Sequence, residues 1–400
     1  MAHSHIAIVG DGVSSLILLA VLRQAGVARG AVSIYGDNAH PLANLQKYAT
    51  SVHQETMRSE GDGHLHPRNF PDLTWQEAWQ NRTLTPFFLN VFNRYNPSLK
   101  LVLNHAAKVA QEFEFEAHRV RTRIGCIRRP PQRAREFDLM DINGQFVGRA
   151  RHVVLALGHP GLNWPGEFEA WRADPRVVHA YEKPALRAGE RVVIVGGGIG
   201  AAHLWLAALD AGSEVIALHR KPLRFQPLNA PRCAFNEAGI ATYRRLRPEE
   251  RLLQLANPLG SSYPKRPHWE KQFDQARKAG RFRTHLGQLS QIEPGRSKAN
   301  RLLLWFNDQT AVEADRLIFA TGFKTDPCGH PVIRQLVDDG AIRMIGEFLY
   351  PNDDFTLAPI SQKNSLLAVI GTLSRFALPV ADTFVGMKYT ARRLLPLLKR

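Results

Sequence analysis

The sequence repeats one pattern at two places in the chain: an apolar strand, a glycine-rich turn and an apolar helix. The first copy occupies residues 6–38 and the second occupies residues 192–221. Glycines in such a turn permit a sharp bend and a close approach of phosphate groups, and the helix N-terminus supplies positive potential. One copy would be a weak signal. Two copies in the same context predict two dinucleotide-binding units in one chain.

Small residues stand where a G-x-G-x-x-G fingerprint needs them in both copies. The turn residues that we expect to approach the two dinucleotides are Gly10, Gly12, Ser14, Ser15, Gly196, Gly198 and Gly200. The apolar spacing predicts strands at 6–9 and 32–35 with a helix at 13–24 between them. It predicts the same layout in the second copy, with strands at 192–195 and 215–218 and a helix at 201–211. This layout is typical of an α/β fold with parallel sheets.

The residues that end the second strand of each copy indicate which nucleotide is bound. In "SIYGDN" the carboxylate of Asp37 is expected near a ribose, although Gly36 holds the place where an acid is commonest. In "ALHRKP" the cations His219, Arg220 and Lys221 replace any acid and suit a ribose 2′-phosphate. The first unit is therefore expected to hold the adenosine diphosphate part of FAD. The second is expected to hold NADPH rather than NADH.

Composition sets limits on the remaining classes of protein. The 400 residues are 44% hydrophobic and 22% charged, which is enough for two or three domains, and no run of 18 apolar residues or signal peptide is visible. We expect a soluble, cytoplasmic protein without a membrane partner. The three cysteines, Cys126, Cys233 and Cys328, are too far apart in sequence for a dithiol motif. The net charge of +16 is spread over many segments, which favours a basic surface that attracts anionic cofactors over a nucleic-acid footprint. Self-association stays open.

The order of four motifs resembles a known family. These are the first fingerprint, "VVLALGHP" at 153–160, the second fingerprint and "DRLIFATGF" at 315–323. This order resembles that of the class B flavoprotein monooxygenases, which include flavin-containing monooxygenases and the N-hydroxylases of lysine and ornithine. The resemblance covers most of the chain and implies two Rossmann-like dinucleotide-binding domains. An NADPH-binding domain, 161–325, would be inserted into an FAD-binding domain made of 1–160 and 326–400.

The resemblance also implies roles for residues outside the fingerprints. Residues matching family segments that join the two domains are Asp315, Phe319, Ala320, Thr321, Gly322, His179 and Tyr181, with Phe323 in place of a tyrosine. Gly158, within "VVLALGHP", is expected to bind a cofactor, as are Thr321 and Gly322. Side chains expected beside the flavin ring are those of Gln54, Arg58, Ser59 and His64, and Gly371 with Thr372 would close over the cofactor. Arg58 and His64 are the candidate catalytic residues. No metal is expected, because His64 and His66 lack further ligands at metal-binding spacing.

The implied activity is that of an NADPH-dependent FAD monooxygenase. Such an enzyme reduces FAD and inserts one oxygen atom of O2 into a small nucleophilic substrate by way of a C4a-hydroperoxyflavin, for example in amine N-hydroxylation. The alternatives are an FAD-dependent NAD(P)H reductase that passes electrons to a carrier or small acceptor, and a binding or sensor protein without turnover. The aromatic residues Trp75, Trp79, Phe87 and Phe88 are expected in the core.

Overall fold

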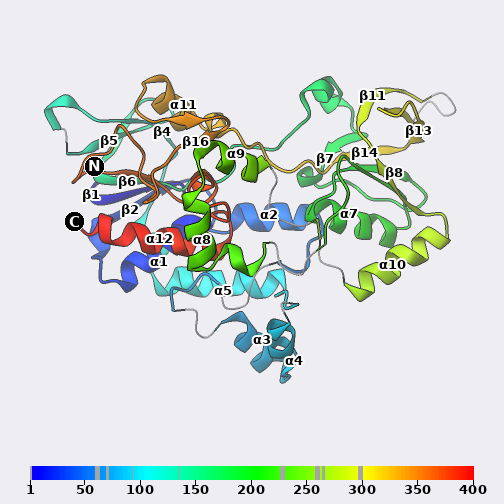
Figure 1. Ribbon diagram of the computed structural model, residues 1–400, viewed down its shortest axis with the longest axis horizontal. Coiled ribbons are helices and arrows are strands. Elements are labelled where there is room, and N and C mark those ends of the chain that lie inside the picture. The colour runs from blue at the N-terminus through cyan, green and yellow to red at the C-terminus, as the bar shows by residue number, and fades with distance from the viewer. Residues whose placement is uncertain are drawn as a thin grey trace.

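The computed structural model describes residues 2–58, 64–68, 72–92, 94–133, 135–225, 230–256, 262–263, 266–295 and 301–400. These residues form two lobes, each built on a parallel sheet (Figure 1). The first lobe contains both ends of the described chain. No helix among the described residues is both long enough and apolar enough to cross a membrane.

The sheet of the first lobe has the strand order β3-β2-β1-β6-β5-β4, with β17 also paired to β6. Its parallel strands are β3 (Arg119–Arg121), β2 (Val32–Gly36), β1 (Ala2–Val9), β6 (Phe146–Leu155) and β17 (Leu367–Val369). The strands β5 (Phe137–Asp141) and β4 (Ile124–Arg128) continue it antiparallel beyond β6. A tight turn joins β5 to β6, in which the Asp141 carboxylate accepts hydrogen bonds from the amides of Asn143 and Gln145, both at 2.8 Å.

Helices surround this sheet and extend the first lobe. Helices α1 (Val13–Gln24) and α12 (Phe384–Leu398) lie side by side along it (Figure 1). Their apolar residues join one buried core with β1 and β6, in which Ile8, Leu16 and Val154 are fully buried. The other helices of this part are α2 (Ala43–Ser51), α3 (Leu73–Asn81), α4 (Thr85–Val91), α5 (Leu99–Glu112), α6 (Phe115–His118) and α11 (Pro331–Asp338). A small hairpin, β15 (Met344–Ile345) and β16 (Phe348–Leu349), follows α11.

The second lobe has a fully parallel sheet in the order β10-β9-β8-β14-β7. Its strands are β10 (Phe282–Leu286), β9 (Glu214–His219), β8 (Arg191–Val195), β14 (Arg316–Phe319) and β7 (Val177–His179). Helices α7 (Ile199–Asp210) and α10 (Pro267–Lys278) pack around Trp205 and Phe273. A three-stranded sheet of β11 (Leu289–Pro294), β12 (Leu302–Phe306) and β13 (Ala311–Ala314) packs around Phe319 and Leu304.

The chain crosses between the lobes at two segments that pair with each other. The Asn163 amide donates to the carbonyl of Gly322 at 3.0 Å, and the Lys324 amide donates to the carbonyl of Gly161 at 2.9 Å. These antiparallel hydrogen bonds join the exit after β6 to the return after β14. The position of the second lobe is therefore fixed by backbone hydrogen bonds and not by a single flexible linker.

A stack of three rings reinforces this crossing. The ring of Phe323 lies between those of His159, 4.6 Å away at 12°, and Tyr181, 4.7 Å away at 14°. Tyr48 of α2 contacts the edge of the same stack, at 4.9 Å from Phe323. The two joining segments and α2 thus share one aromatic cluster, to which His159 contributes although the sequence did not single it out.

Two helices that follow β9 pack on the first lobe. Helices α8 (Glu237–Arg245) and α9 (Pro248–Ala256) lie over the first lobe, on the side that faces the second, in the view of Figure 1. The Tyr243 hydroxyl donates to the carbonyl of Phe376 at 3.0 Å, and Arg251 pairs with Asp353 at 3.2 Å. Segment 237–256 therefore packs on the first lobe, although in the sequence it comes between β9 and β10, which are strands of the second lobe.

The expected core position of the aromatic side chains near residue 80 is wrong for three of the four. Trp75, Trp79 and Phe88 are exposed, Trp79 by 85% and Phe88 by 64%, and Phe87 is half-buried. The reason is that α3 and α4 form a hairpin that buries only one side. Smaller residues such as Leu73 and Ala78 take the buried positions.

Candidate functional site

The first glycine turn connects β1 to α1 and fits a phosphate-binding loop. Gly10 has φ of +105°, and a side chain there would collide with the carbonyl oxygen of Ala156. A Cβ at Gly12 would meet nothing within 4 Å. Gly12 is also the N-cap of α1, which has no side-chain cap and no acid in its first turn. The N-terminus of α1 is thus open to an anionic group at the point where a pyrophosphate would approach.

The C-terminal part of the chain completes this loop. The Ser15 hydroxyl donates to the carbonyl of Gly10 at 2.5 Å, and the Ser14 hydroxyl contacts the sulfur of Met387 at 3.4 Å. Gly371 has φ of +72°, and a Cβ there would press on the Ser14 hydroxyl. The structure therefore brings Gly371 and its neighbour Thr372 to the first glycine turn, beside four of the residues expected at the first dinucleotide.

Asp11 fills the place where the sequence lacks an acid at the end of β2. A Cβ on Gly36 would overlap the carboxyl group of Asp11. That carboxylate accepts hydrogen bonds from Asn38, from its amide at 3.1 Å and from its side-chain nitrogen at 2.5 Å, and it lies 3.4 Å from Nε of Arg119. Burial raises the pKa of Asp11, and the contacts with Asn38 and Arg119 oppose that shift. Asp37 itself is exposed, with Arg123 at 3.9 Å.

The second glycine turn, between β8 and α7, repeats the geometry of the first. Gly196 has φ of +142°, and a side chain there would collide with the carbonyl oxygen of Ala320. A Cβ at Gly198, the N-cap of α7, would meet nothing within 4 Å, and α7 has no side-chain cap and no acid in its first turn. Gly200 lies against Tyr181, whose hydroxyl would be 3.3 Å from a Cβ there.

The end of β9 carries the three residues expected at the ribose 2′-phosphate, His219, Arg220 and Lys221. His219 lies beside this turn, because a Cβ on Gly197 would be 3.3 Å from the Cβ of His219. Burial lowers the pKa of His219, and a hydrogen bond to the Lys221 carbonyl opposes that shift. Arg220 and Lys221 are exposed and make no ion pair with a carboxylate among the described residues. Both cations are therefore available to a phosphate group.

A cluster of positive side chains occupies the seam between the lobes. Arg266, the N-cap of α10, donates to the Thr56 hydroxyl at 2.7 Å and stacks over Trp269. Arg58 is buried, and burial together with the nearby charge of Arg266 lowers its pKa to about 10. Burial and the two arginines lower the pKa of His203 to about 3, and its buried Nε2 has no hydrogen-bond partner among the described residues. A neutral imidazole and two guanidinium groups suit an anionic ligand group.

His64 lies in a different environment from Arg58. Its ring is buried against those of His105, 6.0 Å away, and Phe384, 5.5 Å away. Burial, His105 and Lys388 lower the pKa of His64 well below its usual value, so that its ring is neutral at physiological pH. The structure therefore does not give the two candidate catalytic residues the same neighbours. Ser59 lies outside the described residues.

The other residues implied by the resemblance gather at the crossing. The Thr321 hydroxyl donates to the carbonyl of Asn163 and lies 3.5 Å from Nε2 of His179. Gly322 has φ of +79° and faces open space, as does Gly158 with φ of +71°. Burial lowers the pKa of His179 to about 4. Thr321, Gly322 and Gly158 thus lie in or next to the two paired segments that cross between the lobes.

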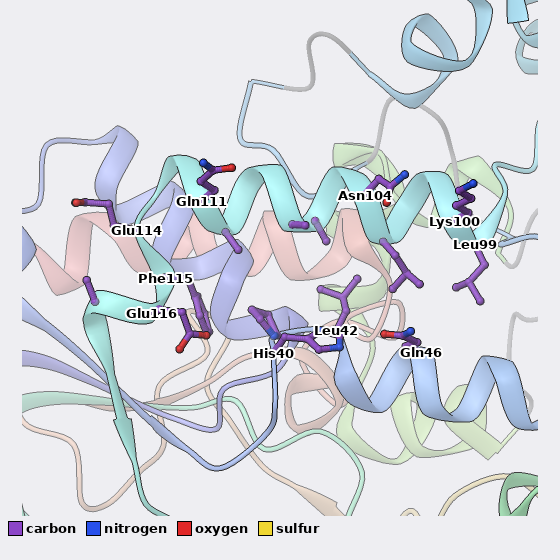
Figure 2. Close-up of a pocket in the computed structure, with 16 residues that line it drawn as sticks. His40, Leu42, Gln46, Leu99, Lys100, Asn104, Gln111, Glu114, Phe115 and Glu116 are labelled. Carbon is purple, nitrogen blue, oxygen red and sulfur yellow. The ribbon is translucent and has the colours of Figure 1, made fainter. Parts of the chain in front are cut away.

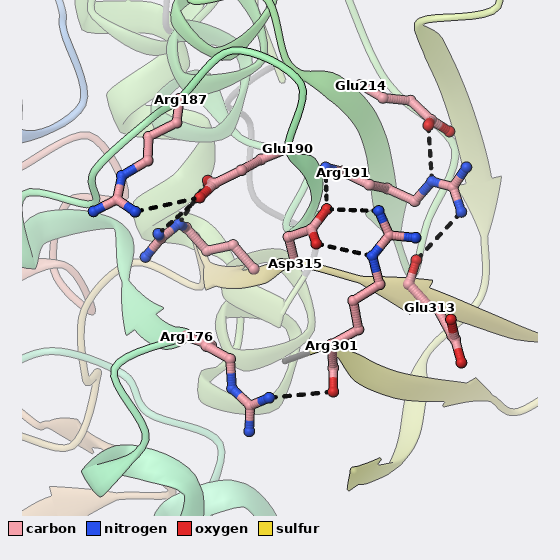
Figure 3. A network of polar contacts seen from close by, with 9 residues as sticks. Arg176, Arg187, Glu190, Arg191, Glu214, Arg301, Glu313 and Asp315 are labelled. Atoms are coloured by element: carbon pink, nitrogen blue, oxygen red, sulfur yellow. Dashed lines mark hydrogen bonds and ion pairs between the residues drawn. The ribbon is translucent and has the colours of Figure 1, made fainter. Parts of the chain in front are cut away.

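Asp315 supports the second lobe. Its carboxylate accepts two hydrogen bonds from Arg301, at 2.8 and 3.2 Å, and one from the Arg191 amide at 2.8 Å (Figure 3). Glu190 and Glu214 pair with further arginines in the same network. These contacts link the start of β8 to the residues that precede β14 and β12. They therefore help to fix the position of β8 and of the glycine turn that follows it.

A groove of about 890 Å³ lies outside both glycine turns. Figure 2 shows it between α5 and the start of α2, with Leu42 and Phe115 on its floor and Asn104 and Gln111 above. None of the residues expected from the sequence lines it. Among the described residues, no group of three or more potential metal ligands occurs.

Residues that the sequence did not single out complete the site. They are Asp11, Asn38 and Arg119 at the first turn, and Arg266 and His203 at the seam. The sequence held a signal for Asp11. The first glycine turn contains a carboxylate, and the end of the following strand has Gly36 where an acid is commonest, so that Asp11 could have been predicted to replace that acid. The other four depend on contacts between distant segments.

No protein-family model and no curated protein matches the chain. Solved structures do. An ornithine N-hydroxylase from Kutzneria sp. 744, described with reduced FAD, NADP⁺ and L-ornithine, is 15% identical, with a TM-score of 0.76 and 99% of each chain covered. An ornithine hydroxylase from Pseudomonas aeruginosa is 16% identical, with a TM-score of 0.74 and 99% of each chain covered. An L-lysine 6-monooxygenase from Pseudomonas syringae is 18% identical, with a TM-score of 0.72, over 100% of this chain and 99% of that one.

The expected α/β fold with parallel sheets is therefore confirmed. It is similar, over nearly the whole length of the chain, to the fold of flavoprotein monooxygenases with two dinucleotide-binding domains, and the insertion of one domain into the other stays a prediction.

Proposed function

We propose that the protein is an NADPH-dependent FAD monooxygenase that acts on a small substrate with a nucleophilic nitrogen and an acidic group. The observation that carries this proposal is the pair of glycine turns. Each has an uncapped helix N-terminus, and each has a glycine, Gly12 or Gly198, beside which there is open space. The solved structures of similar fold include two ornithine hydroxylases and a lysine monooxygenase.

The residues present fit the two cofactors. We assign FAD to the first turn, where Gly10, Gly12, Ser14, Ser15 and Gly371 meet, and NADPH to the second, with its phosphate at Arg220 and Lys221. The NADPH-binding domain would be residues 161–325, inserted into an FAD-binding domain of 1–160 and 326–400. When bound, the flavin would accept a hydride from the nicotinamide and supply the chemistry that activates oxygen.

The chain's own residues would position the reactants and exclude water. Arg58 of the first lobe lies near Arg266 at the start of α10, and the Arg266 guanidinium group is held in place by its hydrogen bond to Thr56. We propose that they bind the acidic group of the substrate, and that the neutral His203 donates a hydrogen bond from Nε2. This would leave the nucleophilic nitrogen of the substrate as the group that reacts.

NADPH consumption and hydroxylated product, measured together, test the proposal. The full-length protein is loaded with FAD and supplied with L-ornithine, L-lysine and the matching diamines putrescine and cadaverine. We expect product from at least one amino acid in a constant ratio to NADPH consumed, and less from its diamine. NADPH oxidation that continues at the same rate with a dye instead of oxygen, without hydroxylated product, would support a reductase instead.

The reductase alternative has less support in the structure. The three cysteines, Cys126, Cys233 and Cys328, are free thiols. They lie in different parts of the fold, on β4, before α8 and before α11. A dithiol relay therefore has no candidate pair, and an acceptor of another kind is the form of this alternative that the dye experiment examines.

A further inference from the structure

The hairpin formed by α3 and α4 exposes an unusual share of the apolar surface. Large apolar side chains exposed on it are Trp75, Trp79, Leu84, Phe88, Leu89, Val91 and Phe92. Elsewhere in the described part of the chain only four are exposed: Ile142, Phe225, Leu253 and Leu286. Figure 1 shows the hairpin projecting below α5, away from both sheets. Such a concentration of exposed apolar residues marks an interaction surface.

The inner side of the hairpin explains why it keeps its shape while its outer side is exposed. Leu73 and Ala78 are buried, and Tyr95 donates from its hydroxyl to Glu77 at 2.7 Å. The rings of Trp75 and Phe87 pack edge to face at 4.9 Å between the two helices. The exposed side chains are thus presented by an ordered element.

The outer residues of α4 and of its two cap positions, Leu84 and Phe92, form a single stripe. Leu84, Phe88, Val91 and Phe92 follow the spacing i, i+4, i+7, i+8, which places them on one face of a helix, and each is more than 60% exposed. Trp79 adds an indole ring at the end of α3. Stripes of this kind, with tryptophan and phenylalanine, are typical of helices that lie in the interface of a bilayer.

The charges around the stripe favour an anionic lipid surface over a second copy of this chain as the partner of the hairpin. Residues 78–99 contain no acid, and their only charged side chains are the cations Arg82 and Arg94. The two acids that precede them are engaged within the hairpin, because Asp72 caps α3 and Glu77 accepts from Tyr95. The whole chain carries a net charge of +16, so a second copy would be repelled and an anionic surface attracted.

We propose that the α3–α4 hairpin docks the protein on an anionic lipid bilayer. Phe88 and Phe92 enter the interfacial region with Trp79, and Arg82 and Arg94 contact the lipid phosphates. Neither helix is long enough to span the bilayer, so that the protein lies on the surface. This differs from the expectation of a protein without a membrane partner, and it does not depend on the nucleotide chemistry.

Sedimentation with vesicles tests the proposal on the full-length protein. We expect it to sediment with vesicles of phosphatidylcholine and phosphatidylglycerol, less with phosphatidylcholine alone, and less as salt is raised. The double substitution Phe88→Ser/Phe92→Ser should weaken binding by about tenfold or more. The control Ile142→Ser, whose side chain is 61% exposed far from the hairpin in sequence, should not.

Melting temperature and sedimentation velocity separate the remaining outcomes. All variants should melt as the parent does, because the replaced side chains are exposed. Failure of the parent protein to bind anionic vesicles would overturn the proposal, and so would equal losses in the double variant and the control. If the double substitution converts a dimer to a monomer and no vesicle binding is seen, the hairpin is an interface between copies of the chain and the proposal is wrong.

Discussion

The carboxyl group of Asp11 occupies the space that a side chain at Gly36 would fill. Gly36 ends β2, at the position where a dinucleotide-binding fold commonly carries an acid, and Asp11 lies inside the first glycine turn. The negative charge is therefore kept at this place but is contributed by another element. Asp11 holds Asn38 and Arg119, which define the loop that follows β2.

Exchange of these two residues tests this relationship. Gly36→Glu alone forces two carboxyl groups into one space, and we expect it to reduce FAD affinity about tenfold and the free energy of unfolding by about 1–3 kcal/mol. Asp11→Gly/Gly36→Glu should recover most of both losses, because one carboxylate remains. FAD fluorescence titration and urea unfolding measure the effects. A double variant no better than the single one would contradict the account, and a loss of affinity in Asp37→Asn would assign the ribose to Asp37.

Selectivity for NADPH should depend on the end of β9. Arg220→Ala/Lys221→Ala removes two cations that have no described carboxylate partner, so we expect the KM for NADPH to rise about 10- to 100-fold with little change for NADH. Steady-state NAD(P)H oxidation measures both values. Arg283→Ala on β10 is the control, since it removes an exposed cation from the same sheet. Equal effects on both nucleotides would place the 2′-phosphate elsewhere.

The seam should distinguish substrates by their acidic group. Arg266→Gln removes a guanidinium that lies beside Arg58, and we expect a rise in the KM for L-ornithine of about tenfold or more. The KM for putrescine should change little, because it lacks the carboxylate. Product formation at several concentrations of each amine measures the split. A parallel rise for both amines would indicate a loss of structure at the seam instead.

The ion pair between Asp315 and Arg301 should stabilise the second lobe. Asp315→Asn weakens a partly buried, two-point contact, and we expect the free energy of unfolding to fall by about 1–2 kcal/mol. Asp274→Asn removes an exposed pair with Arg277 on α10 and should cost less than about 0.5 kcal/mol. Urea denaturation compares the two. Equal losses would mean that the Asp315 network has no special part in placing the second turn.

Acid should destabilise the protein through its buried histidines. Burial lowers the pKa of His105 to about 4, and of His152 and His179 to about the same value, so these rings are neutral in the fold. The unfolded chain takes up protons below about pH 6.5, and stability is therefore lost as the pH falls from there toward 4. Each histidine contributes at most about 1.4 kcal/mol per pH unit. His105→Asn should flatten the dependence of the unfolding free energy on pH between about 4 and 6.5, and an unchanged dependence in this variant would contradict the account.

The sequence predicted the repeated strands and helices well because their signals are local. The helix expected at 13–24 is α1 itself, and the one expected at 201–211 is α7 shifted by two residues at its start. Apolar periodicity and glycine turns act within one element, so that they are visible without the fold. The fold class follows from the repetition of that unit.

The parts that the sequence did not predict depend on contacts between distant segments. Arg266 forms a hydrogen bond with Thr56, which is 210 residues away in the sequence. His159, in the segment that leaves the first lobe, stacks on Phe323, in the segment that returns to it. The exposed aromatic residues of α3 and α4 were expected in the core, because the sequence does not distinguish an apolar side chain on the surface from one in the interior. Burial is decided by what the tertiary structure packs against each face.

Anaerobic titration of the FAD-loaded protein with NADPH tests the central claim most directly. The two lobes that carry the glycine turns are joined by the paired segments at Gly161 and Gly322. The account requires that electrons pass from NADPH at the second turn to FAD at the first. We expect the absorbance of oxidised flavin to disappear as one NADPH is added for each FAD. A protein that binds FAD and NADPH but leaves the flavin oxidised in an excess of NADPH would contradict the account.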